Sequence, residues 1–498
     1  MKIRVVEGDP LALPSEALIV SLFEDDQRPT GALKAVDAAL GGALSTLIEQ
    51  GEIKGKLGEA HVLHTLGRIA PQRVIVCGLG KQPDFTLDRA RIVAANAARA
   101  LRKLNVERAS TVLHGTDAGV DAPLAARALA EGTLLGLYTF DKYRKEPEAR
   151  KELRELSIVG AEAESPAHLE QAVGVGEVCA DAASFCRDLV NEPANNMTPS
   201  ALAERARDFA QELGLEIQVL ERDDMERLAM GGLLAVSKGS SQPAKLIVLS
   251  YHGDADSEAR LGFVGKGITF DSGGLSIKPS EHLDEMKGDM AGAAAVLCAV
   301  QAIARLKPKV NVTGLMPATE NMPDGGAYRP GDILKALSGK TIEITSTDAE
   351  GRLILADALA YARQLGLAPL VDVATLTGAC AVALGNVCSG GFTNDQQLMD
   401  RVVAAGADAG ERIWQLPMFE EYKEQNKSDN ADIKNTGGRN AGAITAAQFL
   451  AEFSGDTPWV HLDIAGTSFS EKEHGYTPKG ATGVMVRTLV NLALSLAR

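Results

Sequence analysis

Hydrophobic and polar positions in the first third of the chain alternate between short apolar runs and longer amphipathic stretches. The short runs predict buried strands, and the longer stretches predict helices because their apolar residues recur at helical spacing. Strands are expected at residues 2–6, 17–22, 73–77, 110–114 and 156–160, and helices at residues 87–104 and 122–138. An alternation of this kind is typical of an α/β domain.

The same alternation resumes in the second part of the chain. Residues 143–155 are dense in Lys, Arg and Glu and predict a solvated connection, and residues 167–189 predict one long helix. Beyond Asn191-Glu-Pro193, strands are expected at 216–220, 246–250, 261–264, 310–315, 370–374 and 459–463, with helices at 201–213, 290–306, 353–365 and 483–496. Sheets built this way place their sites at the C-terminal ends of strands.

The length of 498 residues is too great for one ordinary core. We therefore expect an α/β protein of two domains, a smaller N-terminal one and a larger C-terminal one with a mixed sheet flanked by helices. The expected boundaries are 1–165 for the first domain, 166–190 for a linking helix and 191–498 for the second domain.

Composition narrows the class of protein. The net charge of −15 argues against general binding of nucleic acid or anionic membranes. The six cysteines are scattered without a C-x-x-C pair, which is typical of reduced core residues in a cytosolic protein. No apolar secretory segment follows the first residues, and the longest apolar run, 290–304, is too short to span a bilayer. We expect that run to be a buried helix and the protein to be cytoplasmic, without a membrane partner.

Candidate chemistry begins at residues 345–358, T-S-T-D-A-E-G-R-L-I-L-A-D-A, which predict a strand end, an acidic turn and a helix start. Asp348, Glu350 and Arg352 alternate along that turn, so two carboxylates can share cations beside an arginine. The same letters also fit a capping box, in which Thr347 and Glu350 satisfy free N–H groups of the following helix. Taken alone, the capping box is the more common meaning of such a pattern.

A second acidic cluster lies upstream. Residues 264–274 read V-G-K-G-I-T-F-D-S-G-G, in which a strand runs into a glycine-rich loop with Lys266 and Asp271, followed by Lys278 and Asp289. Taken singly, Asp289 fits a helix N-cap and the two lysines fit a solvated surface. Taken together, four carboxylates converging in one α/β domain would repel one another unless divalent cations were bound. Oxygen-rich sites suit Mn²⁺ or Mg²⁺ and also accept Zn²⁺, and no histidine belongs to either cluster.

These segments carry a resemblance to a known family. In chain order, V-G-K-G-I-T-F-D-S-G-G, M-K-G-D-M-A-G-A-A-A-V, E-N-M-P-D-G-G-A-Y-R-P-G-D, T-D-A-E-G-R-L-I-L-A-D-A-L and A-T-L-T-G-A closely resemble the leucyl (cytosol) aminopeptidases, bacterial type. The resemblance runs from Asn191 to the C-terminus, whereas the first third matches only in length and α/β pattern. Ser346 stands where many relatives carry Asn, and Asp324 and Gly326 alter the loop after Met322-Pro.

The resemblance implies two divalent ions, Mn²⁺ or Zn²⁺, that share and activate a water. It assigns Lys266, Asp271, Asp289 and Glu350 to one ion, and Asp271, Asp348 and Glu350 to the other. It also implies that cationic Lys278 stabilises the oxyanion and that Arg352 holds a bicarbonate acting as general base. Backbone groups of Leu376 and Gly378 would bind the peptide, and Met286 and Thr375 would line the pocket for its first side chain.

The expected activity is removal of N-terminal residues from peptides, with Leu and Met favoured. Substrate specificity is expected to be broad, because an apolar pocket distinguishes between side chains by only about 1–3 kcal/mol per methylene. The resemblance also implies a homohexamer. Two other functions stay open at this point: a two-metal phosphatase or nuclease, which could use similar carboxylates, and a DNA-binding module, which the acidic charge disfavours.

Overall fold

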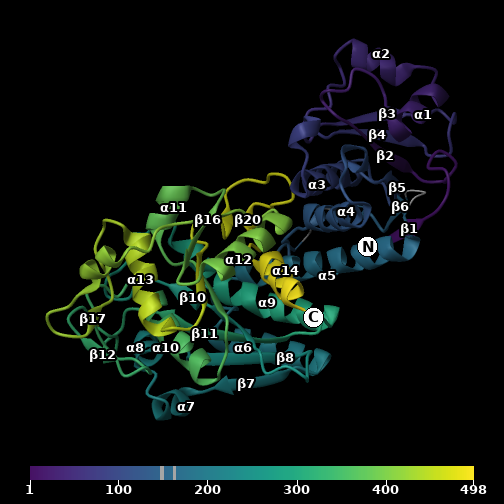
Figure 1. Ribbon diagram of the computed structural model, residues 1–498. Helices are drawn as coiled ribbons and strands as arrows, with labels where there is room; N and C mark the ends of the chain where they lie inside the picture. Colours follow the sequence, from purple (N-terminus) through teal and green to yellow (C-terminus); the bar gives the residue numbers. More distant parts are fainter. Residues whose placement is uncertain (146–150, 161–163, 498) are drawn as a thin grey trace. The chain divides into compact units, whose positions relative to one another are not determined.

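The computed structural model describes residues 1–145, 151–160 and 164–497, and it divides into two compact units (Figure 1). The smaller unit comprises residues 1–181 and 472–478, and the larger comprises 182–471 and 479–498. Helix α5 (Pro166–Asn191) contributes residues to both. Part of the connection expected at 143–155, and residues 161–163 of the expected first domain, lie outside the described residues.

The smaller unit is built on a six-stranded sheet in which only β3 runs antiparallel to its neighbour. Alternate strand residues face opposite helix layers: Leu18 and Val20 pack with α1 and α2, and Ile19 packs with α3 and α4. The strand order is β1 (Lys2–Val6), β6 (Glu155–Val159), β5 (Arg108–Val112), β2 (Ala17–Leu22), β4 (Arg73–Gly78) and β3 (Ala60–His64). The helices are α1 (Gly31–Ala39), α2 (Ala43–Glu49), α3 (Leu87–Lys103), α4 (Ala122–Leu137) and the 3-10 turns η1 (Gln82–Asp84) and η2 (Thr116–Ala118).

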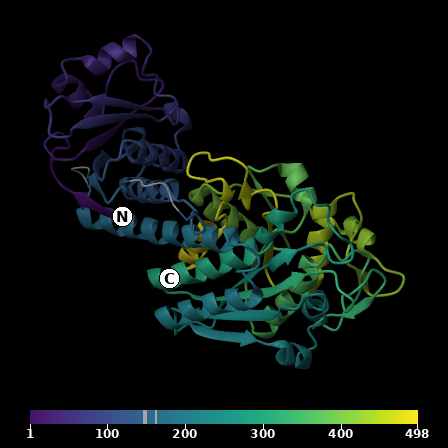
Figure 2. The same cartoon turned by 180° about the vertical axis from the view of Figure 1, so that it is seen from behind.

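The larger unit is built on a nine-stranded mixed sheet, and β7 and β8 form the edge visible in teal in Figures 1 and 2. Its central strands β18, β14, β9 and β11 are parallel, so their C-terminal ends meet on one side. The order is β16 (Ile413–Gln415), β15 (Ser389–Thr393), β18 (Trp459–Asp463), β14 (Leu370–Ala374), β9 (Leu261–Gly265), β11 (Asn311–Asn321), β8 (Lys245–His252) and β7 (Glu216–Leu220), with β10 (Gly267–Asp271) paired to β11. Smaller sheets join β12 (Ile333–Lys335), β13 (Thr341–Glu343) and β17 (Ile433–Lys434), and β19 (Phe469–Ser470) with β20 (Gly480–Ala481).

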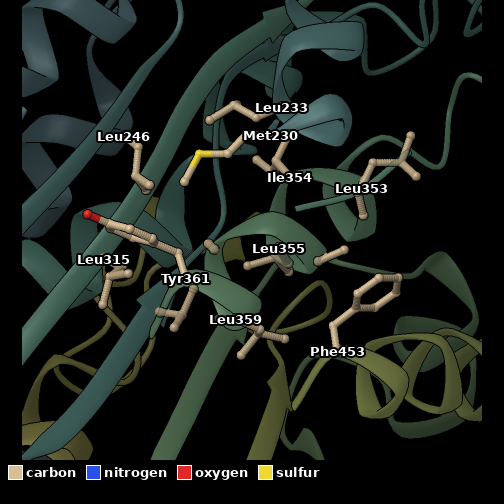
Figure 3. Close-up of a cluster of buried hydrophobic side chains, with 14 of the residues drawn as sticks. Met230, Leu233, Leu246, Leu315, Leu353, Ile354, Leu355, Leu359, Tyr361 and Phe453 are labelled. Atoms are coloured by element: carbon tan, nitrogen blue, oxygen red, sulfur yellow. The ribbon is translucent and has the colours of Figure 1, made fainter. Parts of the chain in front are cut away.

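Helices cover both faces of that sheet. On one face α9 (Ala291–Leu306) packs with α6 (Pro199–Leu213) and α14 (Val486–Leu496), and α14 packs with α12 (Gln396–Ala409). On the other, side chains such as Leu315 pack with those of α8, α10 and α13 in the core drawn in Figure 3. The remaining helices are α7 (Arg222–Arg227), α8 (Gly231–Ser237), α10 (Gly351–Gln364), α11 (Gly378–Leu384), α13 (Gly442–Ser454), η3 (Leu283–Gly288) and η4 (Glu420–Asn426).

The fold class predicted from the pattern is confirmed, and two local predictions are corrected. Residues 267–271, expected as part of a glycine-rich loop, form strand β10. A side chain at Gly267 would place its Cβ 2.5 Å from the Pro317 carbonyl oxygen, so glycine permits the close approach of β10 to β11. The strand expected at 310–315 continues to Asn321, which brings its end beside Asp271.

Among the described residues, one helical stretch, Leu283–Leu306, is long and apolar enough to cross a membrane. A further candidate arises only if α1 and α2, which are bent by 112°, are counted as one segment. In Leu283–Leu306, 83% of the most apolar window is buried inside the structure, as in a core helix. This agrees with the buried helix expected from the sequence.

Candidate active site

The predicted site residues gather in the larger unit where strands end and helices begin. Lys266 separates β9 from β10, and Asp271 is the last residue of β10. Asp289 lies between η3 and α9, and Glu350 immediately precedes α10. The fold therefore brings together side chains that lie more than 80 positions apart in the sequence.

Lys266 is the buried centre of this cluster. Its Nζ lies 2.8 Å from Asp289 Oδ1, 3.0 Å from Glu350 Oε1 and 2.8 Å from the Thr375 carbonyl oxygen, and the residue is 3% exposed. Gly351 allows this arrangement, because a Cβ there would lie 2.4 Å from the Lys266 side chain. Lys266 and Glu350 thus point toward each other, as a shared site requires.

A second ion-pair group adjoins the first. Lys278 Nζ lies 2.8 Å from Asp271 Oδ2 and 2.6 Å from Asp348 Oδ1, and the Lys278 side chain is 22% exposed. Asp271 Oδ1 also accepts the backbone N–H of Gly273 at 2.9 Å. Lys278 therefore joins the two acidic segments while keeping part of its surface open.

The structure contradicts the alternative interpretations of these residues as a capping box, a helix N-cap and solvated surface lysines. Glu350 occupies the N-cap position of α10 without a side-chain capping bond, and the Thr347 hydroxyl donates to the Gly273 carbonyl oxygen at 2.7 Å. The N-cap of α9 is Met290, so Asp289 does not cap that helix. Neither Lys266 nor Lys278 is a solvated surface lysine.

Burial and charge shift the proton affinities of the cluster. Burial raises the pKa of Asp289 to about 8 and that of Asp271 to about 6, although neighbouring lysines oppose both shifts. Burial alone would raise the pKa of Glu350, but Lys266 and Lys278 hold it below its ordinary value. Burial alone would lower the pKa of Lys266, but the carboxylates of Asp289, Glu350 and Asp271 raise it above the usual range. The group therefore holds more negative charge than two ammonium groups neutralise.

The donor set fits divalent cations. Carboxylate oxygens of Asp271, Asp348 and Glu350 all lie within 4.8 Å of one another. The buried oxygens Asp289 Oδ2 and Glu350 Oε2 have no hydrogen-bond partner among the described residues. Buried carboxylate oxygens without a partner are unusual, and a bound cation would supply the missing interaction.

A cavity of about 310 Å³ opens beside this cluster. Every residue proposed from the sequence lines it except Arg352. The predicted lining residues are Lys266, Asp271, Lys278, Met286, Asp289, Asp348, Glu350, Thr375, Leu376 and Gly378. Those that sequence reasoning did not single out include Val190, Ala381, Ala465, Ser468 and Phe469.

Arg352 belongs to α10 and is not among the residues that line the cavity. The side chain is buried, and its Nη1 donates to the Asn435 carbonyl oxygen at 2.7 Å. Its Nε has no hydrogen-bond partner among the described residues, and burial lowers the pKa of the guanidinium to about 10. The guanidinium thus retains an unused donor.

Three buried polar residues that support the acidic segments were not singled out from the sequence. The Asn435 side-chain oxygen accepts Thr345 N–H at 2.8 Å, and its amide nitrogen donates to the Ser346 carbonyl oxygen at 2.7 Å. Asn321 and Tyr328 both donate to the Thr347 carbonyl oxygen, at 3.0 and 2.8 Å. All of these bonds cross 19 to 90 positions of sequence, so no local pattern reveals them.

Comparisons with known proteins match both units of this chain. The catalytic-domain profile of the cytosol aminopeptidase family matches residues 184–490, and its N-terminal-domain profile matches residues 19–147. Probable cytosol aminopeptidases of Alkaliphilus metalliredigens and Geobacter sulfurreducens are 48% and 47% identical, each over 100% of both sequences.

Two solved structures are similar to this chain over nearly its whole length. A mutant form of tomato leucine aminopeptidase superposes with a TM-score of 0.88 at 35% identity, covering 99% of this chain and 97% of that one. The bottromycin maturation enzyme BotP in complex with Mn superposes with a TM-score of 0.84 at 36% identity, covering 97% and 100%.

Matches of this extent define the protein as a hydrolase of the peptidase class, and specifically an aminopeptidase. The chain belongs to the cytosol aminopeptidase family, so the resemblance carried by its motifs is confirmed.

Proposed function

We propose that the protein removes N-terminal residues from peptides in a metal-dependent reaction, with a preference for Leu, Met and other apolar residues. The observation that carries the proposal is the pair of unpartnered buried oxygens, Asp289 Oδ2 and Glu350 Oε2, beside a cavity whose wall includes both lysines. The solved structure of BotP in complex with Mn, which covers 97% of this chain, supports the same class of cofactor.

Two divalent ions, Mn²⁺ or Zn²⁺, would be held by the carboxylates and by Lys266. Asp271 and Glu350 would contact both ions, Asp289 and Lys266 would complete one set, and Asp348 would complete the other. Lys266 must lose a proton to act as a ligand, and a neighbouring dication favours that loss. When bound, such ions supply Lewis acidity and lower the pKa of a bound water toward neutrality.

The chain's own residues would then orient the peptide and stabilise charge. Lys278 lines the cavity, and its ammonium would donate to the oxyanion that develops on the scissile carbonyl. Leu376 and Gly378 line the same cavity, and their backbone groups would hold the peptide main chain. Met286 and Thr375 would line the pocket for the first side chain.

Arg352 would hold a bicarbonate that accepts a proton as general base. Support comes from its unused Nε donor and from the absence of a histidine among the residues that line the described cavity. A small anion would neutralise the buried guanidinium and use that donor.

Hydrolysis of Leu-p-nitroanilide, compared with that of a phosphate ester, tests the reaction class. We expect the protein to cleave the anilide and not the phosphate ester. Removal of metal with a chelator should abolish this activity, and added Mn²⁺ or Zn²⁺ should restore it. An N-acetylated substrate should be resistant, because an aminopeptidase needs the free amino group. Full activity in protein shown by elemental analysis to lack metal would refute the metal requirement.

The cellular setting proposed is the cytoplasm, with a homohexamer as the assembly. The names of the curated relatives support the location. A net charge of −15 disfavours DNA as a partner, and a salt-dependent gel shift would detect such binding. Light scattering of the purified protein would test the hexamer.

A further inference from the structure

Asn321 lies where the two acidic segments of the site meet. It is the last residue of β11, directly beside Asp271 at the end of β10, and it is fully buried. Its backbone carbonyl oxygen accepts both the N–H and the hydroxyl of Ser272, at 3.0 and 2.7 Å. These main-chain hydrogen bonds hold the residue in place independently of its side chain.

The side chain of Asn321 uses its amide nitrogen on two acceptors. Nδ2 donates to Asp271 Oδ1 at 2.8 Å and to the Thr347 carbonyl oxygen at 3.0 Å. Because a carboxylate and a carbonyl can only accept, the nitrogen and not the oxygen must face them. Neither Asp nor Leu at this position could make both bonds, although both share the branched outline of Asn.

These two bonds connect the segments that carry the ligands. One partner is the Asp271 carboxylate itself, and the other is the peptide unit that precedes Asp348. The Tyr328 hydroxyl donates to the same Thr347 oxygen at 2.8 Å but makes no bond to Asp271 in the described structure. Asn321 thus orients the Asp271 carboxylate and fixes its separation from the turn bearing Asp348 and Glu350.

We propose that Asn321 is a positioning residue that holds the Asp271 carboxylate in the orientation required to bind a divalent cation. The inference rests on the metal centre of the proposed function. Hydrogen-bonded neighbours of metal-binding carboxylates orient their oxygens, and their loss typically weakens metal affinity or activity by about 10–100-fold.

The test compares Asn321→Leu with Asn311→Leu. Asn311 is the first residue of the same strand, is also buried, and donates through its amide nitrogen to the Asp254 and Ser257 carbonyl oxygens. Both substitutions remove a buried amide of the same size and both should lower the melting temperature. Only Asn311→Leu leaves the acidic segments untouched, so it controls for loss of stability alone.

Equilibrium dialysis with Mn²⁺, followed by elemental analysis, gives affinity and stoichiometry without relying on activity. We expect Asn321→Leu to bind Mn²⁺ about 10–100-fold more weakly and Asn311→Leu to match wild type within about threefold. Tyr328→Phe, which keeps the Asp271 bond, should fall between them. In metal-saturated protein, kcat should fall in Asn321→Leu while KM for the peptide changes little.

Unchanged Mn²⁺ affinity in Asn321→Leu, or an equal loss in Asn311→Leu, would overturn the positioning role. Asn321→Ala, which leaves space for a water, provides the same comparison if the leucine variant does not fold. A wild-type protein that binds no Mn²⁺ would overturn the metal centre together with this inference, so the two failures are distinguishable.

Discussion

Replacing Lys266 by Met in metal-free protein tests the electrostatics of the site directly. Methionine keeps much of the length of the side chain but removes the ammonium that contacts Asp289 at 2.8 Å and Glu350 at 3.0 Å. Glu350 would keep a buried charge with one cation fewer beside it, since Lys278 pairs directly with Asp271 and Asp348. Asp289, whose pKa burial raises to about 8, would lose its ion-pair partner. The variant should therefore be strongly destabilised.

The expected size follows from the burial of the pair. Removing one partner of a buried ion pair costs about 3–5 kcal/mol. With an unfolding entropy of about 2.1 cal/mol/K per residue over roughly 300 residues of the larger unit, each kcal/mol lowers the melting temperature by about 1.5 °C. We expect the transition of that unit to fall by about 5–8 °C.

Scanning calorimetry in the presence of a chelator at neutral pH measures this shift. Lys245→Met is the matched control, because Lys245 is also largely buried but pairs with Glu221, whose side chain is 49% exposed. A pair with one solvated partner contributes about 0–1 kcal/mol, so the control should shift by less than about 2 °C. Equal shifts in the two variants would refute the proposed dependence of the carboxylates on Lys266.

Three further substitutions test the assigned roles through hydrolysis of Leu-p-nitroanilide. Glu350→Gln should abolish turnover while circular dichroism stays that of the wild type, and near-normal turnover would contradict its place at both ions. Lys278→Met should lower kcat by about 10²–10³-fold with little change in KM, and an effect on KM alone would rule out the oxyanion role. Arg352→Ala should slow the reaction, with partial rescue by added bicarbonate, and a wild-type rate indifferent to bicarbonate would count against that base.

The motifs indicated the polar groups of the proposed site because each belongs to a short segment with its own local signature. Asp348 and Glu350 are two positions apart in one acidic segment, and Lys266 and Asp271 both belong to the segment V-G-K-G-I-T-F-D-S-G-G. The sequence could not decide whether these residues cap helices or gather at one shared site. That choice depends on contacts such as Lys266 to Glu350, which span 84 positions and exist only after the sheet has formed.

The buried amides that hydrogen-bond to the acidic segments could not be predicted from the sequence for the same reason. Asn435 and Asn321 act through single amides that reach across the fold, and an isolated Asn has no periodicity to mark it. Strand β10 was missed because Gly267 lowers its strand propensity, whereas the structure uses this glycine for close approach to β11. Long-range polar bonds and glycine contacts were thus the parts that the sequence pattern did not predict.

The different burial of the two lysines argues for a division of their roles. Lys266 is only 4% exposed in its side chain, and its ammonium already contacts two carboxylates and the Thr375 carbonyl oxygen. Lys278 is 22% exposed at the cavity wall, and cations bound by Asp271 and Asp348 would compete for the carboxylates that hold its ammonium. Metal binding would therefore release Lys278 toward the peptide carbonyl, whereas Lys266 would stay within the ligand cluster.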